Sequence, residues 1–179
     1  WSWIIVGSCK KVIKLKLIYI KNNKTKYIQD FENVLIQRMQ SLIDIKMVPL
    51  SHKKKFRYDK ELINYEGDLI NNELKGDNRF FCFDKKGEKF TSEKFSKIIF
   101  SQNKNINFII GGAYGLCNEI KIRSQKVISF SDMEFSHEIF RLMVLEQIYR
   151  AKCIYTNHPY HQNWKVIYLQ SIMAELDFF

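Results

Sequence analysis

Short apolar segments alternate with longer amphipathic ones along most of this chain. Five short segments are wholly apolar or alternate apolar with polar residues, as strands do, at 14–20, 44–50, 79–84, 107–110 and 126–130. Five longer segments repeat apolar residues at helical spacing, at 25–41, 59–74, 91–101, 116–124 and 137–154. Strands and helices that alternate in this way predict an α/β fold with a mainly parallel sheet and helices on both of its faces.

Turn-forming and capping residues separate these segments. The second strand is expected to end at Pro49, and the following helix at Gly76. The run Lys85–Glu88 is expected to be a loop, and Thr91 or Ser92 to cap the next helix. Residues 107–110 are wholly apolar, which is typical of a strand buried on both faces. With 179 residues and no convincing linker, the chain is expected to form one domain.

The net charge of +10 is confined to the first third of the chain. Residues 1–60 hold 14 Lys and Arg against 4 Asp and Glu, whereas residues 61–179 hold 15 of each. A basic excess indicates a polyanionic partner, either nucleic acid or an anionic membrane. An AT-rich coding bias would also raise the Lys count, but it would not confine the excess to one region. The densest part is the loop 51–58, whose Lys53, Lys54, Lys55 and Arg57 are the candidate RNA-binding residues.

Several protein classes lack support in the composition. The four cysteines, Cys9, Cys82, Cys117 and Cys153, form no C-x-x-C pair, so neither a zinc site nor a disulfide scaffold is indicated, and reduced thiols are expected. No apolar run approaches the ~20 residues that span a bilayer. The apolar opening, residues 1–7, precedes its basic residues, unlike a signal peptide, although it could be a remnant of a targeting segment.

Three loops carry the candidate chemistry. Gly111–Gly115 follows a buried strand, but it matches neither G-x-G-x-x-G nor G-K-[ST], so a nucleoside triphosphate or dinucleotide site is not indicated. Ser131–Ser136 is a polar connection in which Ser136 could cap the next helix. Tyr155–His161 concentrates two His and two Tyr, a composition suited to stacking and hydrogen bonding with a base, or to an ordinary surface loop. No metal site is expected.

Together these loops resemble a known family. The segments Phe108–Leu116, Ile128–Met133, Leu145–Ala151 and Asn157–His161 are similar, in order and spacing, to the RlmH family. Members of that family are methyltransferases of the SPOUT class, which act at N3 of a pseudouridine in 23S ribosomal RNA. The resemblance covers residues 14–162, so residues 1–13 and 163–179 are expected to be extensions.

The resemblance implies a SPOUT-type α/β fold with a deep C-terminal trefoil knot, an exception to the rule that chains do not thread loops. It also implies a homodimer and S-adenosylmethionine bound in the knot, mostly by backbone groups. The implied cofactor-binding residues are Phe83, Gly111, Gly112, Ser131, Asp132, Met133, Glu134, Phe135 and Ser136.

The expected catalytic residues lie near the end of the family match. Methyl transfer to N3 needs a base for the N3 proton or stabilisation of the anion. His158 and His161 are the candidate bases, because imidazole titrates near neutral pH. Arg150 could stabilise the uracil anion or hold a phosphate. Glu146 could orient Arg150 from one helical turn away, or form an ordinary surface pair with it.

Tyr160 could stack on the base, and the substrate would be the large ribosomal subunit or the assembled ribosome. The alternatives are a non-catalytic RNA-binding or ribosome-associated protein, and a SPOUT methyltransferase with another RNA target. No membrane partner is expected. The expected location is the cytoplasm, or a plastid or mitochondrion if residues 1–13 remain from a targeting segment.

Overall fold

The computed structural model describes residues 12–21, 25–102 and 105–161. Their sheet has five strands in the order β2-β1-β4-β3-β5, and every neighbouring pair is parallel. The strands are β1 (Ile13–Ile20), β2 (Ile43–Leu50), β3 (Phe80–Lys89), β4 (Ile106–Ile110) and β5 (Lys126–Ser129). The predicted α/β fold with a parallel sheet is therefore confirmed.

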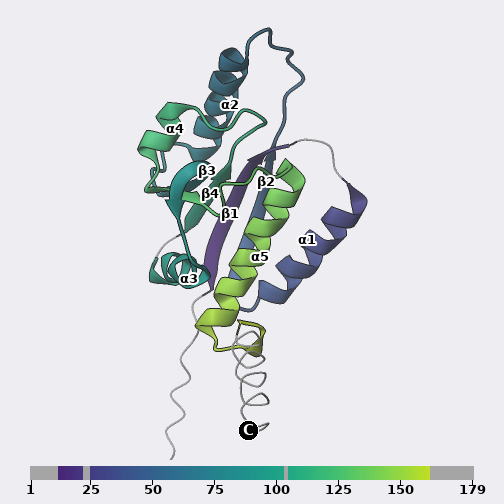
Figure 1. Cartoon of the computed structure of the whole chain (residues 1–179), viewed down its shortest axis with the longest axis vertical. Helices are drawn as coiled ribbons and strands as arrows, with labels where there is room; N and C mark the ends of the chain where they lie inside the picture. Colours follow the sequence, from purple (N-terminus) through teal and green to yellow (C-terminus); the bar gives the residue numbers. More distant parts are fainter. Residues whose placement is uncertain (1–11, 22–24, 103–104, 162–179) are drawn as a thin grey trace, which may run out of the picture.

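Helices cover both faces of this sheet (Figure 1). One core lies between the sheet and helices α1 (Lys26–Met39), α3 (Ser92–Ser101) and α5 (His137–Tyr155). A smaller core lies on the other face, against α2 (Asp59–Leu74) and α4 (Asn118–Arg123). No helix in the described part of the chain is long and apolar enough to cross a membrane.

The strand β1 shows how one sequence serves both cores. Its Leu15, Leu17 and Tyr19 pack on the side of α1 and α5, whereas Ile18 and Ile20 pack on the side of α2 and α4. Successive side chains of a strand point to opposite faces of a sheet. A strand that is apolar at both sets of positions must therefore lie inside a three-layer structure, as β1 does.

The predicted end of the third strand is wrong. Residues Lys85–Glu88 were expected to form a loop, but they belong to β3. This strand pairs with β5 in two stretches, first at Phe81–Phe83 and again at Glu88–Lys89, with a register shift between them. The close approach of the two strands requires glycine at position 87, because a Cβ atom there would lie 2.6 Å from the carbonyl oxygen of Val127. The predicted cap at Thr91 is confirmed, since its side chain accepts a hydrogen bond from the backbone of Lys94.

Strand β2 ends at Leu50, the last residue of its predicted range and one residue past the Pro49 expected to stop it. The backbone N–H of Lys21 donates to the carbonyl of Leu50 at 2.7 Å, so the polar groups of Leu50 face β1. Because these groups alternate in direction along a strand, the ring nitrogen of Pro49 points away from β1. β2 is the edge strand, and so the missing N–H interrupts no ladder.

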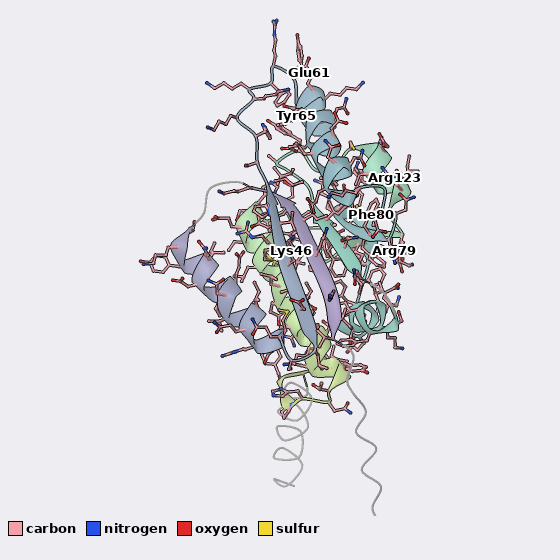
Figure 2. The ribbon with its side chains drawn as sticks, turned by 180° about the vertical axis from the view of Figure 1, so that it is seen from behind. Lys46, Glu61, Tyr65, Arg79, Phe80 and Arg123 are labelled. Atoms are coloured by element: carbon pink, nitrogen blue, oxygen red, sulfur yellow. The ribbon has the colours of Figure 1, made fainter. Side chains whose placement is uncertain are left out.

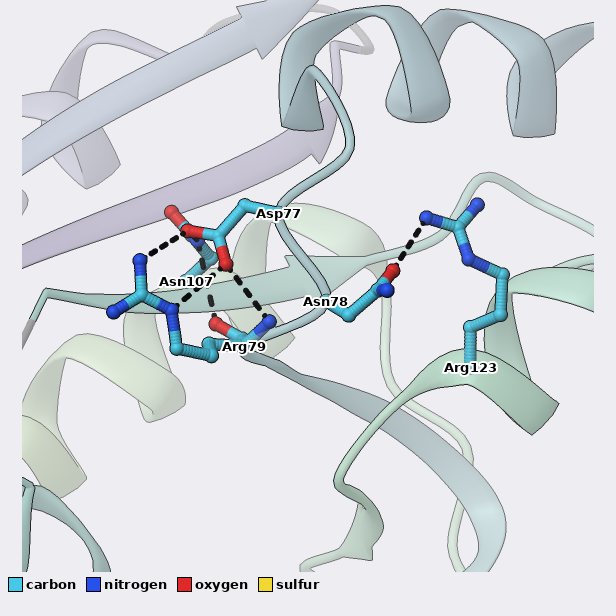
Figure 3. Close-up of polar contacts among 5 residues, drawn as sticks. All are labelled: Asp77, Asn78, Arg79, Asn107 and Arg123. Atoms are coloured by element: carbon cyan, nitrogen blue, oxygen red, sulfur yellow. Dashed lines mark hydrogen bonds and ion pairs between the residues drawn. The ribbon is translucent and has the colours of Figure 1, made fainter.

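The amino ends of β3 and β4 are joined by a polar network (Figure 3). Asp77 accepts hydrogen bonds from the backbone and side chain of Arg79, both at 3.0 Å, and from Asn107 at 3.3 Å. Arg123 of α4 binds Asn71 and Asn78 at 2.6 and 2.8 Å. Seen from behind, Arg79 and Arg123 lie on either side of Phe80 near the start of β3, and Lys46 lies on β2 (Figure 2). These bonds fix the connection between α2 and β3.

Helix α1 is tied to the start of α5. Glu32 and Arg141, both buried, form an ion pair at 2.6 Å, and the guanidinium of Arg141 lies over the ring of Tyr19. Thr25 donates two hydrogen bonds to the carboxylate of Glu138. These contacts hold the first two turns of α5 in place, next to the loop that precedes it.

The described cysteines, Cys82, Cys117 and Cys153, are free thiols, while Cys9 lies outside the described residues. So do the two predicted extensions, apart from Val12 and Ile13. The trefoil knot stays a prediction.

Candidate functional site

A cavity of about 510 Å³ opens at the carboxyl ends of β3, β4 and β5. Parallel sheets bind ligands at this edge, because their loops gather there. Its apolar walls are Phe83, Ile110, Ile128, Phe130 and Phe140. The volume and the mixture of aromatic walls with a few polar groups are those of a small-molecule site.

Six of the nine predicted cofactor residues line this cavity: Phe83, Gly111, Ser131, Met133, Glu134 and Phe135. The other three do not. Gly112, within the glycine loop, packs against Glu66 instead, and Asp132 forms an exposed ion pair with Lys89. Ser136 is the N-cap residue of α5, but its side chain makes no capping hydrogen bond.

The glycine loop bends tightly along one wall. The backbone N–H of Gly115 donates to the carbonyl of Gly112 at 2.9 Å, and Gly115 has a φ of +83°. A side chain at Gly111 would lie 2.7 Å from the carbonyl carbon of Gly115. Both positions therefore require glycine, and the loop presents its backbone to the cavity.

A charged pair that the sequence did not single out lies in the same cavity. Asp84, at the end of the apolar part of β3, binds Lys121 of α4 at 3.0 Å. Burial acts to raise the pKa of Asp84, but the backbone N–H of Lys86 and the ammonium of Lys121 outweigh it and lower that pKa. An ionised carboxylate in this cavity can bind a cationic or hydroxyl group of a ligand.

His137, the first residue of α5, also lines the cavity. Burial and the nearby guanidinium of Arg141 lower its pKa, opposed by a hydrogen bond with the backbone of Gly111. The lowered pKa favours the neutral imidazole. Sequence reasoning missed His137, because it resembles an ordinary residue in the first turn of a helix.

The loop before α5 owes its shape to Ser131. Its hydroxyl accepts a hydrogen bond from the backbone N–H of Met133 at 3.0 Å, and its carbonyl accepts one from Ser129 at 3.1 Å. This turn brings Met133 and Phe135 to the cavity. Glu134 lies at the rim, where it pairs with Lys85.

The predicted catalytic residues form a second cluster at the far end of α5. Glu146 accepts hydrogen bonds from Arg150 at 2.6 Å and from the hydroxyl of Tyr160 at 3.0 Å. The guanidinium of Arg150 lies 4.8 Å from the ring centre of Tyr160. Burial and the Glu146 carboxylate raise the pKa of Tyr160, so its phenol stays protonated at neutral pH. The predicted pairing of Glu146 with Arg150 is thus present.

Both candidate bases follow the tight ending of α5. Asn157 has a φ of +53°, and the backbone N–H of His158 donates to the carbonyl of Cys153 at 2.8 Å, which is a Schellman motif. The ring Nδ1 of His158 then accepts from the backbone of Tyr160, so that His158 is exposed but turned toward its own chain. The Nε2 of His161 lies 3.2 Å from a carboxylate oxygen of Glu93.

The two clusters are separate within one chain. The 13 residues from His137 to Arg150 span about 20 Å of helix. Between them, a smaller cavity of about 290 Å³ is lined by Glu146 and Met143, and it shares Phe130 with the larger one. Of the predicted catalytic residues, only Glu146 lines this smaller cavity, and none lines the larger one.

The basic loop lies at the same sheet edge as the large cavity, beyond the end of β2 (Figure 1). Lys53, Lys54, Lys55 and Arg57 are all exposed. His52, at the base of this loop, lies 3.6 Å from Glu66, whose carboxyl group touches the glycine loop. The basic region, distant in sequence from the glycine loop, is thus connected to it through His52 and Glu66.

Among the described residues, no group of three or more His, Cys, Asp or Glu side chains could hold a metal ion.

Comparisons with known proteins agree on one family. Residues 13–161 match the family described as "Predicted SPOUT methyltransferase". The chain is 38% identical over 153 residues to "Ribosomal RNA large subunit methyltransferase H" of Dictyoglomus thermophilum, an alignment covering 83% of this chain and 99% of that relative. It is 33% identical over 159 residues to the protein of the same name from Clostridium acetobutylicum, covering 84% and 100%.

A solved structure supports the fold. The "probable methylase family protein" of Haemophilus influenzae superimposes with a TM-score of 0.53 at 9% identity, over 81% of this chain and 69% of that one.

Proposed function

Because the chain belongs to the SPOUT methyltransferase family, and within it to the RlmH group, we propose that it transfers a methyl group from S-adenosylmethionine to N3 of a pseudouridine in large-subunit ribosomal RNA. The observation that carries this proposal is the cavity at the carboxyl ends of β3, β4 and β5, with the glycine loop as one wall.

The residues of this cavity fit the cofactor. Phe83, Ile128 and Phe140 offer an apolar surface for an adenine ring, and the glycine loop allows backbone groups to approach it. Asp84 and Lys121 offer charges of both signs for ribose hydroxyls or for the amino and carboxyl groups of the methionine part. When bound, S-adenosylmethionine supplies an activated methyl group on a positively charged sulfur.

The far cluster of α5 supplies the chemistry at the base. Arg150, oriented by Glu146, is placed to stabilise the negative charge that develops on the uracil ring. Tyr160 donates a hydrogen bond and offers a ring edge beside the target base. His161 or His158 takes the N3 proton, and Glu93 steadies the imidazolium that forms on His161.

A homodimer would bring the two clusters together. Within one chain Glu146 and Arg150 lie further along α5 than the cavity residues His137 and Phe140, and a second copy can present its far cluster to the first cavity. An apolar helix face is available for such contact, because Tyr27, Phe31 and Val34 of α1 are exposed at successive turns and Ile139 of α5 is exposed as well. Exposed apolar patches of this kind mark protein contacts.

The basic loop is proposed to hold the RNA backbone. Lys53, Lys54, Lys55 and Arg57 would bind phosphates and position the substrate, while the pocket selects the base. The substrate is the large subunit or the assembled ribosome. The relatives reported above are bacterial, which favours the cytoplasm as the location.

Two measurements test the function. Calorimetry with S-adenosylhomocysteine should show one saturable site per chain, and no binding by the folded protein would contradict the proposal. Mass spectrometry of ribosomal RNA nucleosides, with and without the protein, should show N3-methylpseudouridine only when the protein is active. Methylation of another nucleotide would favour a different RNA target, and unchanged RNA would favour a non-catalytic ribosome-associated protein.

His161→Ala tests the assignment of roles. We expect methyl transfer to fall by about 10²- to 10⁴-fold, which is the usual contribution of a general base, with unchanged affinity for S-adenosylhomocysteine. Lys97→Ala, exposed on α3 and outside both clusters, is the control and should keep the transfer rate. Equal loss of transfer and of cofactor binding in His161→Ala would contradict the assignment.

A further inference from the structure

Glu66, in the middle of α2, is a buried carboxyl group for which neither cluster gives a reason. It is 5% exposed, and its Oε2 has no hydrogen-bond partner among the described residues. Burial raises its pKa. A buried polar atom without a partner costs free energy, so its presence needs an explanation.

The carboxyl group lies directly behind the glycine loop. A Cβ atom added at Gly112 would meet Oε2 at 2.2 Å and Oε1 at 2.6 Å. The next helix residue, Gly67, is packed equally closely, since a Cβ atom there would lie 2.6 Å from the Sγ of Cys117. Helix α2 therefore packs as closely as it can against the segment 112–117, with Glu66 in place of the missing side chain at 112.

His52 holds the other side of this carboxyl group. Its Nδ1 lies 3.2 Å from the carbonyl of Lys54, which can only accept, so Nδ1 carries a hydrogen. Its Nε2 lies 3.6 Å from Oε1 of Glu66, and an attractive contact there requires a proton on one of these two atoms. The rings of Phe56 and Tyr65 pack edge-on against the imidazole at 5.6 and 5.5 Å. Oε1 is thereby engaged, and Oε2 is left facing the loop.

We propose that Glu66, held by His52, is a positioning residue for the cofactor: its Oε2 accepts a backbone N–H of the glycine loop when the loop closes on S-adenosylmethionine. Glu66 does not line the cavity, and it acts through the loop in front of it. The inference rests on the proposed function, because that function defines the ligand. It also gives the basic loop a physical connection to the cofactor, through His52.

Two substitutions of similar size distinguish the role of Glu66 as a hydrogen-bond acceptor from its role in filling space. Glu66→Gln keeps an acceptor oxygen, whereas Glu66→Met keeps the volume and removes it. By calorimetry with S-adenosylhomocysteine, we expect Glu66→Met to bind about tenfold more weakly and Glu66→Gln to stay within about threefold of the unaltered protein. Asp68→Asn, exposed on the same helix, is the control and should bind normally.

A second readout excludes a merely structural role. In methyl transfer, Glu66→Met should raise KM for S-adenosylmethionine about tenfold and change kcat by less than about threefold. Its melting temperature without ligand should not fall, because it removes an unpartnered buried polar group. Lower melting temperature and weaker binding in the same proportion would overturn the proposal.

The outcomes distinguish the inference from the proposed function. If the unaltered protein binds no S-adenosylhomocysteine, the proposed function fails. If it binds, and Glu66→Met binds equally well, the inference alone is overturned. Should Glu66→Met not fold, Gly112→Ala takes its place, since the added methyl group displaces the carboxyl group; unaltered affinity there would also overturn the inference.

Discussion

Two carboxylates associated with helix α2 have opposite surroundings. Asp77, three residues after the helix, has partners for both of its oxygens, in Arg79 and Asn107. Glu66, in its middle, is more deeply buried and leaves one oxygen without a partner among the described residues. Hydrogen bonds to Arg79 lower the pKa of Asp77, whereas burial raises that of Glu66.

This difference between the two carboxylates corresponds to a difference between the two ends of the sheet. The amino ends of β3 and β4, near Asp77, are closed by complete hydrogen bonding, which serves stability. The carboxyl ends, near Glu66, keep an unused acceptor and crowded glycines beside a cavity. Functional sites commonly retain such local cost, and stability is supplied elsewhere in the fold.

The largest expected effect comes from the glycines of the two regions. Gly112→Ala places a methyl group where the Glu66 carboxyl lies, and we expect affinity for S-adenosylhomocysteine to fall by about a hundredfold, or ~2.7 kcal/mol. Gly76→Ala, which has open space but a φ of +80°, should leave that affinity unchanged and lower the free energy of unfolding by about 1 kcal/mol. Calorimetry and urea denaturation measure both. Equal affinity of Gly112→Ala and Gly76→Ala for S-adenosylhomocysteine would contradict the distinction between the two ends of the sheet.

The carboxylates themselves should differ in the sign of their effect on stability. Asp77→Ala removes the acceptor of several hydrogen bonds and leaves Asn107 partly unpaired, so we expect a loss of about 1–2 kcal/mol in urea denaturation. Glu66→Gln should keep the stability or raise it by up to about 1 kcal/mol at pH 8. A loss in both variants would mean that Glu66 is satisfied in solution.

The pH dependence should separate the two groups in the same way. The pKa of Asp77 is below its unfolded value of 3.8, so its contribution is present above that pH and is lost as the pH falls through the folded pKa. The pKa of Glu66 is raised above its unfolded value of 4.5. Protonation of Glu66 therefore stabilises the folded protein fully below pH 4.5, and this stabilisation is lost as the pH rises through the folded pKa. Urea denaturation of the unaltered protein, Asp77→Asn and Glu66→Gln from pH 3 to 8 measures how each substitution changes the free energy of unfolding. The same pH dependence in both variants would contradict the prediction.

The smallest effect is expected in the basic loop. Lys53→Gln should weaken RNA binding about threefold and lower the slope of log affinity against log salt by about 0.7–0.9, the contribution of one phosphate contact. Affinity for S-adenosylhomocysteine should not change, because Lys53 is exposed and is not one of the residues packed around Glu66. A salt titration of RNA binding measures the slope, and an unchanged slope would place the RNA elsewhere.

The periodic elements could be predicted from the sequence. Every predicted helix and strand is present, and α5 differs from its prediction by one residue, because its long apolar pattern has no competing interpretation. The second half of β3 could not be predicted. Lys85–Lys89 is polar and contains Gly87, and it is a strand only because β5 pairs with it.

The candidate site was predictable where its residues carry a motif. The glycine loop and Ser131–Ser136 were identified as cofactor-binding through a family resemblance, and most of their residues line the cavity. His52, Glu66 and His137 were missed, because each is unremarkable within its own segment and becomes notable only through contacts across the fold. The one available signal was Gly67, since a glycine in the middle of a helix costs stability and so indicates a close approach.

The outward-facing nitrogen of Pro49 has a consequence for how copies of this chain can aggregate. An open parallel sheet normally offers its edge as a template on which a strand of another molecule can grow, and this leads toward fibrils. On β2 the proline withholds one donor from that edge, and the charges of Asp44 and Lys46 further disfavour a dry stack. Self-association through this edge is therefore discouraged, and contact between copies is directed to the helical faces.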